Sequence, residues 1–136
     1  MVTYNELGRK GRLGNQLFQI ASTIGVAHDN GTDAAFPEWA YAPFFEKPLP
    51  IYSGAPLPNR REDAYHFTPI NGDDINLQGW LQSYKYWANC EDKVREQFKF
   101  KPALAQHVEA KMQLTGKPRI AVSIRRGDFV GNKNYV

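Results

Sequence analysis

The sequence has little of several features that mark specialised classes of protein. A single cysteine, Cys90, among 136 residues excludes an internal disulfide framework and favours a reducing compartment. No apolar run approaches the ~20 residues that a membrane-spanning helix needs, and no signal-peptide pattern opens the chain. The sequence therefore predicts a cytoplasmic protein.

Excess charge and metal-binding patterns are also scarce. The chain carries 17 basic and 14 acidic residues, and the resulting charge of +3 does not by itself indicate nucleic-acid binding. The cations are scattered rather than striped, so a small RNA-binding protein is the least favoured class and no nucleic-acid partner is expected. His28, His66 and His107 lack metal-ligand spacing, so we expect no metal site.

Strand and helix patterns alternate along the chain. Strands are expected in segments 1–7, 32–36 and 75–82. Helices are expected at about 15–29, 84–87, 89–98 and 103–114, the first with Asn15 as N-cap and Asn30-Gly31 as stop. This alternation predicts an α/β fold with a largely parallel sheet.

Two stretches interrupt this alternation. Residues 37–58 hold six of the nine prolines together with several aromatic residues. They predict an ordered surface loop packed on the domain, since prolines oppose long regular elements and aromatic residues oppose disorder. Residues 59–63 read Asn-Arg-Arg-Glu-Asp and predict a charged, solvated turn.

A glycine-rich stretch precedes the first helix. Residues 8–16 hold three glycines and three cations, directly before the helical pattern. Exposed N–H groups and the positive end of a helix dipole favour an anion at such a place. The stretch matches neither a Walker A motif nor G-x-G-x-x-G. On spacing alone, it is more typical of a tight strand–helix connection with Asn15 acting only as cap.

A second basic stretch lies near residue 125. Residues 119–124 predict a buried strand, which ends at Arg125, Arg126, Gly127 and Asp128. Ligands of open α/β sheets bind beyond the carboxyl ends of strands, and paired guanidinium groups suit phosphate or carboxylate. Asp128 can hold one arginine in place or bond a ligand hydroxyl. A solvated turn with an Arg–Asp ion pair explains the same residues equally well.

Three stretches carry longer patterns. Gly11–Gln19 reads G-R-L-G-N-Q-L-F-Q, Gly79–Trp87 reads G-W-L-Q-S-Y-K-Y-W, and Ser123–Val130 reads S-I-R-R-G-D-F-V. They resemble three motifs of glycosyltransferase family 11, the α-1,2-fucosyltransferases: G-G-L-G-N-Q-M-F-Q, G-Y-F-Q-S-E-K-Y-F and H-x-R-R-G-D-Y. All three occur in the family's order and near its spacing.

The resemblance implies the Rossmann-like N-terminal half of a GT-B-like enzyme. Such an enzyme transfers fucose, with inversion, from GDP-β-L-fucose to the 2-hydroxyl of a galactoside acceptor, without a cofactor or metal. By resemblance, Arg125 is the catalytic residue that binds the β-phosphate and stabilises the leaving GDP. The substrate-binding residues implied are Arg12, Gly14, Asn15, Arg126 and Asp128. Gln82 and Tyr86 are expected to be scaffolding.

Two departures from the family pattern bear on the expected site. Ser123 stands where the family has histidine, and Arg12 replaces the second glycine of the first motif, which adds a possible phosphate-facing cation. The family also implies possible peripheral membrane association.

The resemblance covers only the front half of the family pattern. We expect residues 1–115 to form an N-terminal α/β domain and 116–136 to begin a truncated donor-binding domain. On this expectation the chain is a fragment, a truncated gene product or one half of a split protein, and it is inactive alone. The alternative is a non-catalytic anion- or sugar-binding α/β module.

Overall fold

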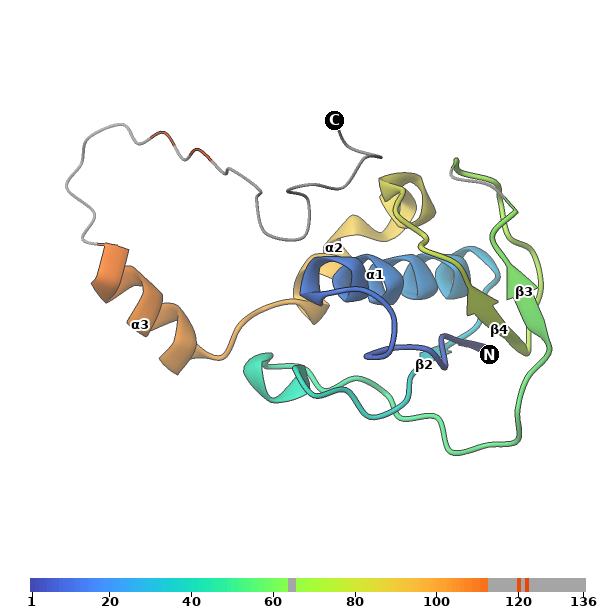
Figure 1. Cartoon of the computed structure of the whole chain (residues 1–136), viewed down its shortest axis with the longest axis horizontal. Coiled ribbons are helices and arrows are strands. Elements are labelled where there is room, and N and C mark those ends of the chain that lie inside the picture. The colour runs from blue at the N-terminus through green and yellow to red at the C-terminus, as the bar shows by residue number, and fades with distance from the viewer. Residues whose placement is uncertain (64–65, 113–119, 121, 123–136) are drawn as a thin grey trace, which may run out of the picture.

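The computed structural model describes residues 1–63, 66–112, 120 and 122, and shows a small α/β fold built on a parallel sheet (Figure 1). The described strands are β1 (Val2–Thr3), β2 (Ala34–Ala35), β3 (Asn59–Arg61) and β4 (Ile75–Gln78). They form a sheet in the order β2-β1-β4-β3, with every pair parallel. The predicted α/β class with a largely parallel sheet is confirmed.

The described helices connect the strands and follow the last of them. The α-helices are α1 (Leu13–Asp29), α2 (Glu91–Gln97) and α3 (Pro102–Met112), and the short 3₁₀ helices are η1 (Ala42–Phe44), η2 (Tyr84–Tyr86) and η3 (Ala88–Cys90). The long helix α1 connects β1 to β2 and packs Ile20 and Ile24 into a core that includes Val2 and Leu77. Burial of this apolar face is the main stabilisation of the helix.

The predicted stop of the first helix is confirmed. Asn30 is the C-cap of α1, and Gly31 follows with φ of +65°, which glycine adopts without steric cost. The side chain of Asn30 donates to the carbonyls of Val26 and Ile70 and accepts from the N–H of Gly72. The helix end is thereby tied to the segment that leads into β4.

The sheet reverses its connection order between β1 and β4. From β1 the chain crosses through α1 to β2 on one side, whereas β4 and then β3 lie on the other side. Because all four strands are parallel, their carboxyl ends meet at one edge of the sheet. Ligands of open α/β sheets bind at such a switch point.

Residues 59–61 are solvent-exposed as predicted, but the predicted turn is wrong at these positions. Residues 59–61 form the edge strand β3, which pairs with β4 from Asn59 opposite Asn76 to Arg61 opposite Gln78. All three residues of β3 are exposed. Exposed charged residues are typical of edge strands, so composition alone does not distinguish this strand from a loop.

The proline-rich loop is ordered and packed, as predicted. Trp39, Phe45 and Leu49 are all buried, and the ring of Phe45 stacks between those of Trp39 and Phe100. The loop follows β2, so it begins at the same carboxyl edge of the sheet.

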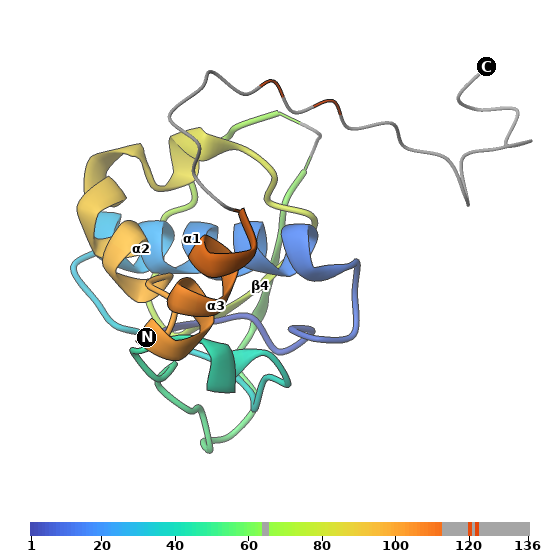
Figure 2. The ribbon, with the colours of Figure 1, turned by 90° about the vertical axis from the view of Figure 1, so that its left-hand side faces the viewer.

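Helix α3 lies apart from the core. The predicted helix at 103–114 is confirmed as far as Met112, but no residue of α3 is buried, and Val108 remains 45% exposed. Figure 1 shows α3 beyond the end of α1, and Figure 2 views the molecule from that end, with α3 in front. Within this helix, Leu104 and Ala105 are partly buried and the other residues are exposed.

The predicted buried strand at 119–124 is described at only two positions. Ile120 and Val122 are 92% and 78% exposed and have no strand conformation, so the prediction is wrong at these positions. An apolar strand is buried only where another element covers it, and no described residue covers these two side chains. The other four residues, and the proposed boundary at 115–116, lie outside the described residues.

Candidate functional site

Two loops meet at the switch point of the sheet. One comprises residues 4–12 after β1, and the other comprises residues 79–83 after β4; together we call them the edge loops. The Tyr4 hydroxyl donates to the Gly79 carbonyl at 2.6 Å, and the Lys10 ammonium lies 4.9 Å from the centroid of the Trp80 ring. The edge loops are thus joined by a hydrogen bond and a cation–π contact.

Asn15 does not have its predicted role as N-cap. Helix α1 begins at Leu13 with Arg12 as the cap residue, so Asn15 is the third residue of the helix. Its Oδ1 accepts a hydrogen bond from the backbone N–H of Arg12 at 3.1 Å. A polar side chain at this position can reach back to the cap residue, as glutamate or glutamine does in a capping box.

Two glutamines of α1 also hold the first edge loop. Gln16 donates to the Gly11 carbonyl at 2.9 Å, and its Oε1 accepts from the indole N–H of Trp39 at 2.8 Å. Gln19 is fully buried and donates to the Lys10 carbonyl at 3.2 Å. Asparagine and both glutamines of the first motif therefore fix the loop backbone, which explains their spacing in structural terms.

The two glycines of the first motif differ in whether the structure requires a residue without a side chain. Gly11 has φ of +78°, and a Cβ there would lie 2.5 Å from the Cβ of Asn15, so a side chain is excluded twice. A Cβ at Gly14 would meet nothing within 4 Å. The first turn of α1 is therefore open, with N–H groups that have no earlier carbonyl in the helix to bond.

The charges around this helix start are positive. Arg9 and Arg12 are exposed and Lys10 is half-buried, and all three lie in the loop that enters α1. No residue of the first helical turn is acidic. Cations and a helix N-terminus together favour an anion, phosphate in particular.

The second edge loop has an unusual backbone. Gly79 has φ of +131°, and the fully buried Leu81 has φ of +52°, which is uncommon for a residue other than glycine. The Glu62 carboxylate accepts from the N–H groups of Trp80 and Leu81 at 3.1 and 2.9 Å, while Ser22 of α1 donates to the Leu81 carbonyl. These bonds hold a strained turn, and such strain often accompanies functional sites.

Two tyrosines of the site keep their protons at neutral pH. Burial raises the pKa of Tyr4 well above its ordinary value of 10, and the nearby Glu6 and Glu62 carboxylates add to the effect. Burial and Glu62 also raise the pKa of Tyr86, whose hydroxyl donates to Glu62 at 3.3 Å. Both hydroxyls therefore act as hydrogen-bond donors that join the site.

The middle motif packs directly on α1. A Cβ at Gly25 would lie 1.9 Å from the Tyr86 carbonyl oxygen, so only glycine allows this close approach. Tyr86 is 2% exposed, as expected for scaffolding, whereas Gln82 is exposed. The middle motif and α1 thus form one packed unit that supports the edge loops.

The structure places three of the six predicted site residues. Arg12, Gly14 and Asn15 lie together at the start of α1, whereas Arg125, Arg126 and Asp128 lie outside the described residues. Sequence reasoning missed Tyr4, Glu62 and Trp80 as parts of this site. The aromatic residue within the Gly79–Trp87 motif was a signal for Trp80, but no local pattern marks Glu62.

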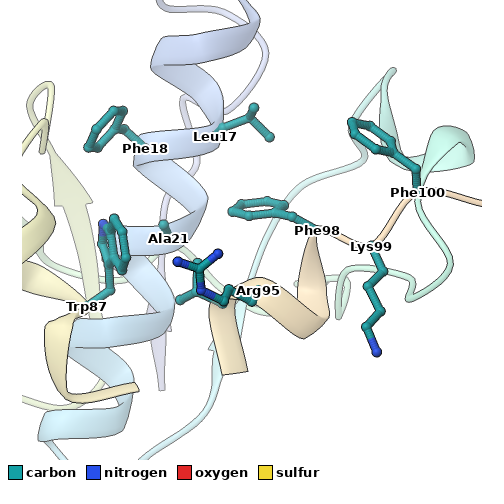
Figure 3. A pocket seen from close by; sticks show the side chains of 9 residues that line it. Leu17, Phe18, Ala21, Trp87, Arg95, Phe98, Lys99 and Phe100 are labelled. Atoms are coloured by element: carbon teal, nitrogen blue, oxygen red, sulfur yellow. The ribbon is translucent and has the colours of Figure 1, made fainter. Parts of the chain in front are cut away.

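An apolar groove of about 490 Å³ lies on another face of α1 (Figure 3). Leu17, Phe18 and Ala21 face Trp87 and Phe98 across it, with Arg95 between them. Arg12, Gly14 and Asn15, the predicted site residues that the structure describes, do not line this groove. We place the candidate site at the edge loops because polar groups converge there, as they do in ligand sites.

The described ranges show neither a metal-binding cluster nor a membrane-spanning helix. Residues 1–63 and 66–112 hold no group of three or more histidine, cysteine, aspartate or glutamate side chains placed to bind a metal ion. No helix in those ranges has the length and apolar character that crossing a membrane requires. The cytoplasmic location and the peripheral membrane association both stay predictions.

Comparisons with known proteins point to one kind of enzyme. The chain is 28% identical over 145 residues to galactoside 2-alpha-L-fucosyltransferase SEC1 of Bos taurus, covering 91% of this chain and 38% of that protein. It is 28% identical over 151 residues to galactoside alpha-(1,2)-fucosyltransferase 2 of Hylobates lar, covering 96% and 42%. It is 29% identical over 141 residues to galactoside alpha-(1,2)-fucosyltransferase 1 of Oryctolagus cuniculus, covering 88% and 37%.

These similarities confirm the predicted resemblance to the α-1,2-fucosyltransferases, which are glycosyltransferases. The chain spans about two fifths of the length of these relatives. No family model matches the chain, and no solved structure matches it.

Proposed function

We propose that the chain forms the N-terminal part of an inverting glycosyltransferase that moves fucose from GDP-β-L-fucose to the 2-hydroxyl of a galactoside. One observation carries the proposal: two stretches that resemble fucosyltransferase motifs support two loops that meet at the switch point of a parallel sheet. The similarity to galactoside α-(1,2)-fucosyltransferases over about nine tenths of the chain supports the reaction class.

The first edge loop would face the diphosphate of the donor. Its three cations and the open first turn of α1 are suited to a phosphate group. The Oδ1 of Asn15 already accepts the Arg12 N–H. The Nδ2 group of Asn15 has no hydrogen-bond partner among the residues described, so it can donate a hydrogen bond to the bound GDP-fucose.

Arg125 would stabilise the departing GDP. Cleavage of the sugar–phosphate bond builds negative charge on the diphosphate, and a preorganised guanidinium binds that charge most strongly in the transition state. Arg126 and Asp128 would support this group. We propose that the reaction needs no cofactor or metal, since these cations can neutralise the diphosphate.

The same proposal divides the chain between two domains. Residues 1–115 would form the N-terminal domain, and 116–136 would begin the donor-binding domain. Since the relatives are more than twice as long, we propose that the 136-residue chain alone has very low activity. A radiolabelled transfer assay with GDP-fucose and lactose tests this; turnover of ~1 s⁻¹ or more would contradict it.

Titration of the ¹⁵N-labelled chain with GDP tests the donor site. We expect GDP to shift the amide signals of Gly11, Gly14 and Asn15. Arg12→Met should weaken GDP binding about fivefold or more, because a charged phosphate contact is lost. Arg60→Met removes an exposed arginine of β3 and is the matched control.

The GDP titration also separates the two candidate functions. GDP binding at the edge loops, without transfer activity in any longer form of the protein, would favour the non-catalytic binding module. If GDP shifts no signal of the edge loops, or if Arg60→Met weakens binding as much as Arg12→Met, the donor site is elsewhere.

A further inference from the structure

Glu62 controls the conformation of the second edge loop. It directly follows β3, and its backbone N–H donates to the Gln78 carbonyl at the end of β4. One carboxylate oxygen, Oε2, accepts the two successive N–H groups of Trp80 and Leu81, and Oε1 accepts from the Tyr86 hydroxyl. Beyond the end of β4, the Glu62 carboxylate therefore accepts the backbone N–H groups that a neighbouring strand would accept within the sheet.

Residues on both sides of Trp80 are constrained as well. A Cβ at Gly79 would lie 2.6 Å from the Cβ of Glu62, so glycine makes room for the carboxylate. The Gly79 carbonyl accepts from Tyr4, and the Leu81 carbonyl accepts from Ser22. The backbone of Trp80 is thereby fixed before any ligand arrives.

Trp80 is a partly exposed residue at the carboxyl edge, and the Lys10 ammonium lies over its ring. The carbonyl of Lys10 is itself held by Gln19, so both partners of the contact project from fixed backbone. An aromatic face that attracts an ammonium group also attracts the positively polarised C–H groups of a pyranose ring. The cation–π contact is weak enough for a ligand to displace.

We propose that the galactoside acceptor stacks a pyranose ring on Trp80, and that Glu62 is the positioning residue that holds Trp80 in place. This inference rests on the proposed function, because it assigns the acceptor to the same switch point that would hold the donor. Trp80 touches the sugar, whereas Glu62 acts only through the turn.

Titration of the ¹⁵N-labelled chain with lactose tests the stacking. The indole N–H signal of Trp80 is identified by its loss in Trp80→Phe, and we expect lactose to shift it. Trp80→Ala should weaken lactose binding about tenfold, in the range of other aromatic stacking contacts, while GDP binding changes less than about twofold. The melting temperature of each variant checks that the fold is retained.

Variants of Glu62 test the positioning role. Glu62→Gln keeps one acceptor oxygen and should retain lactose binding within about twofold. Glu62→Asp keeps the charge but withdraws it from the turn, and should weaken lactose binding about fivefold, as should Glu62→Ala. Asp63→Ala removes the adjacent exposed carboxylate and should have no effect. Glu62→Asp serves as the test if Glu62→Ala does not fold.

The GDP and lactose titrations together separate the proposed donor site from the proposed sugar stacking on Trp80. If GDP shifts the first edge loop but lactose leaves the Trp80 signal unchanged, the stacking inference is wrong and the proposed donor site stands. If Glu62→Asp weakens lactose and GDP binding equally, Glu62 is a general structural residue and not a positioning residue. If neither ligand shifts the edge loops, the proposed function itself fails.

Discussion

Single residues at the start of α1 decide the shape of the first edge loop. Gly11 and Gly14 lie three positions apart in the same motif, yet only Gly11 has a positive φ and a close neighbour. Arg12 and Asn15 complete the turn through one backbone-to-side-chain hydrogen bond. The motif therefore combines a glycine required by geometry with a glycine that leaves space open.

The two glycines give a matched pair of substitutions. Gly11→Ala should destabilise the chain by roughly 1–3 kcal/mol, because alanine is strained at this φ and collides with Asn15. Gly14→Ala should be neutral or stabilise by up to about 1 kcal/mol, since alanine favours a helix and has free space here. Urea unfolding measures both; equal effects would contradict the described turn.

Arg125 is the residue whose chemistry the proposed reaction depends on most. In a full-length form of the proposed transferase, Arg125→Lys should lower kcat/KM by roughly 10²–10³, because lysine keeps the charge but not the planar two-point grip. Arg126→Lys should cost less if that residue only supports the pocket. A folded Arg125→Lys enzyme within about twofold of wild type would remove Arg125 from the catalytic role.

At the scale of elements, α1 is the support for everything at the carboxyl edge. Its polar side chains hold the first edge loop, Ser22 holds the second, and its glycine at position 25 accepts the 3₁₀ helix η2. The edge loops are therefore positioned by one rigid helix. This arrangement suits a binding site, since sites built on regular elements keep their geometry.

The contact between α1 and η2 is testable at Gly25. Gly25→Ala should destabilise the chain by about 2 kcal/mol or more, because the added methyl overlaps the backbone of Tyr86 and Trp87, which cannot rotate away. Gly14→Ala on the same helix is the control. A melting temperature unchanged by Gly25→Ala would show that α1 and η2 are further apart than described.

At the scale of the whole molecule, buried hydroxyl groups make stability sensitive to alkaline pH. Below pH 10, Tyr4 and Tyr86 are protonated in the folded and unfolded states alike. Above pH 10, the unfolded chain loses these protons while the folded chain keeps them, since burial raises both pKa values in the fold. The unfolded state then binds fewer protons, so the free energy of unfolding decreases as pH rises.

We therefore expect the free energy of unfolding to decrease above pH 10, and to decrease less steeply in Tyr4→Phe. At neutral pH the same variant should lose about 1 kcal/mol, because the hydrogen bond to the Gly79 carbonyl is removed. Urea unfolding at several pH values measures both effects. Identical slopes for Tyr4→Phe and the wild type would show that Tyr4 is not the group responsible.

The sequence by itself determined the elements whose signals are local. Helical periodicity and the Asn30-Gly31 stop located α1 and its end, and turn residues between apolar runs located β1, β2 and β4. Arg12, Gly14 and Asn15 come from one continuous motif, so the sequence also predicts that they lie together, while their role in a site stays a prediction. These features depend on neighbours only a few positions away, which a sequence displays directly.

Only the tertiary structure decided the rest. The strand β3 exists because β4 lies beside it, and Glu62 matters because its carboxylate reaches a turn 18 residues further along the chain. The left-handed backbone conformation of Leu81 and the contact of Lys10 with Trp80 likewise arise from contacts between distant segments. Such contacts leave no periodic trace in the sequence, because each is set by how the folded elements pack.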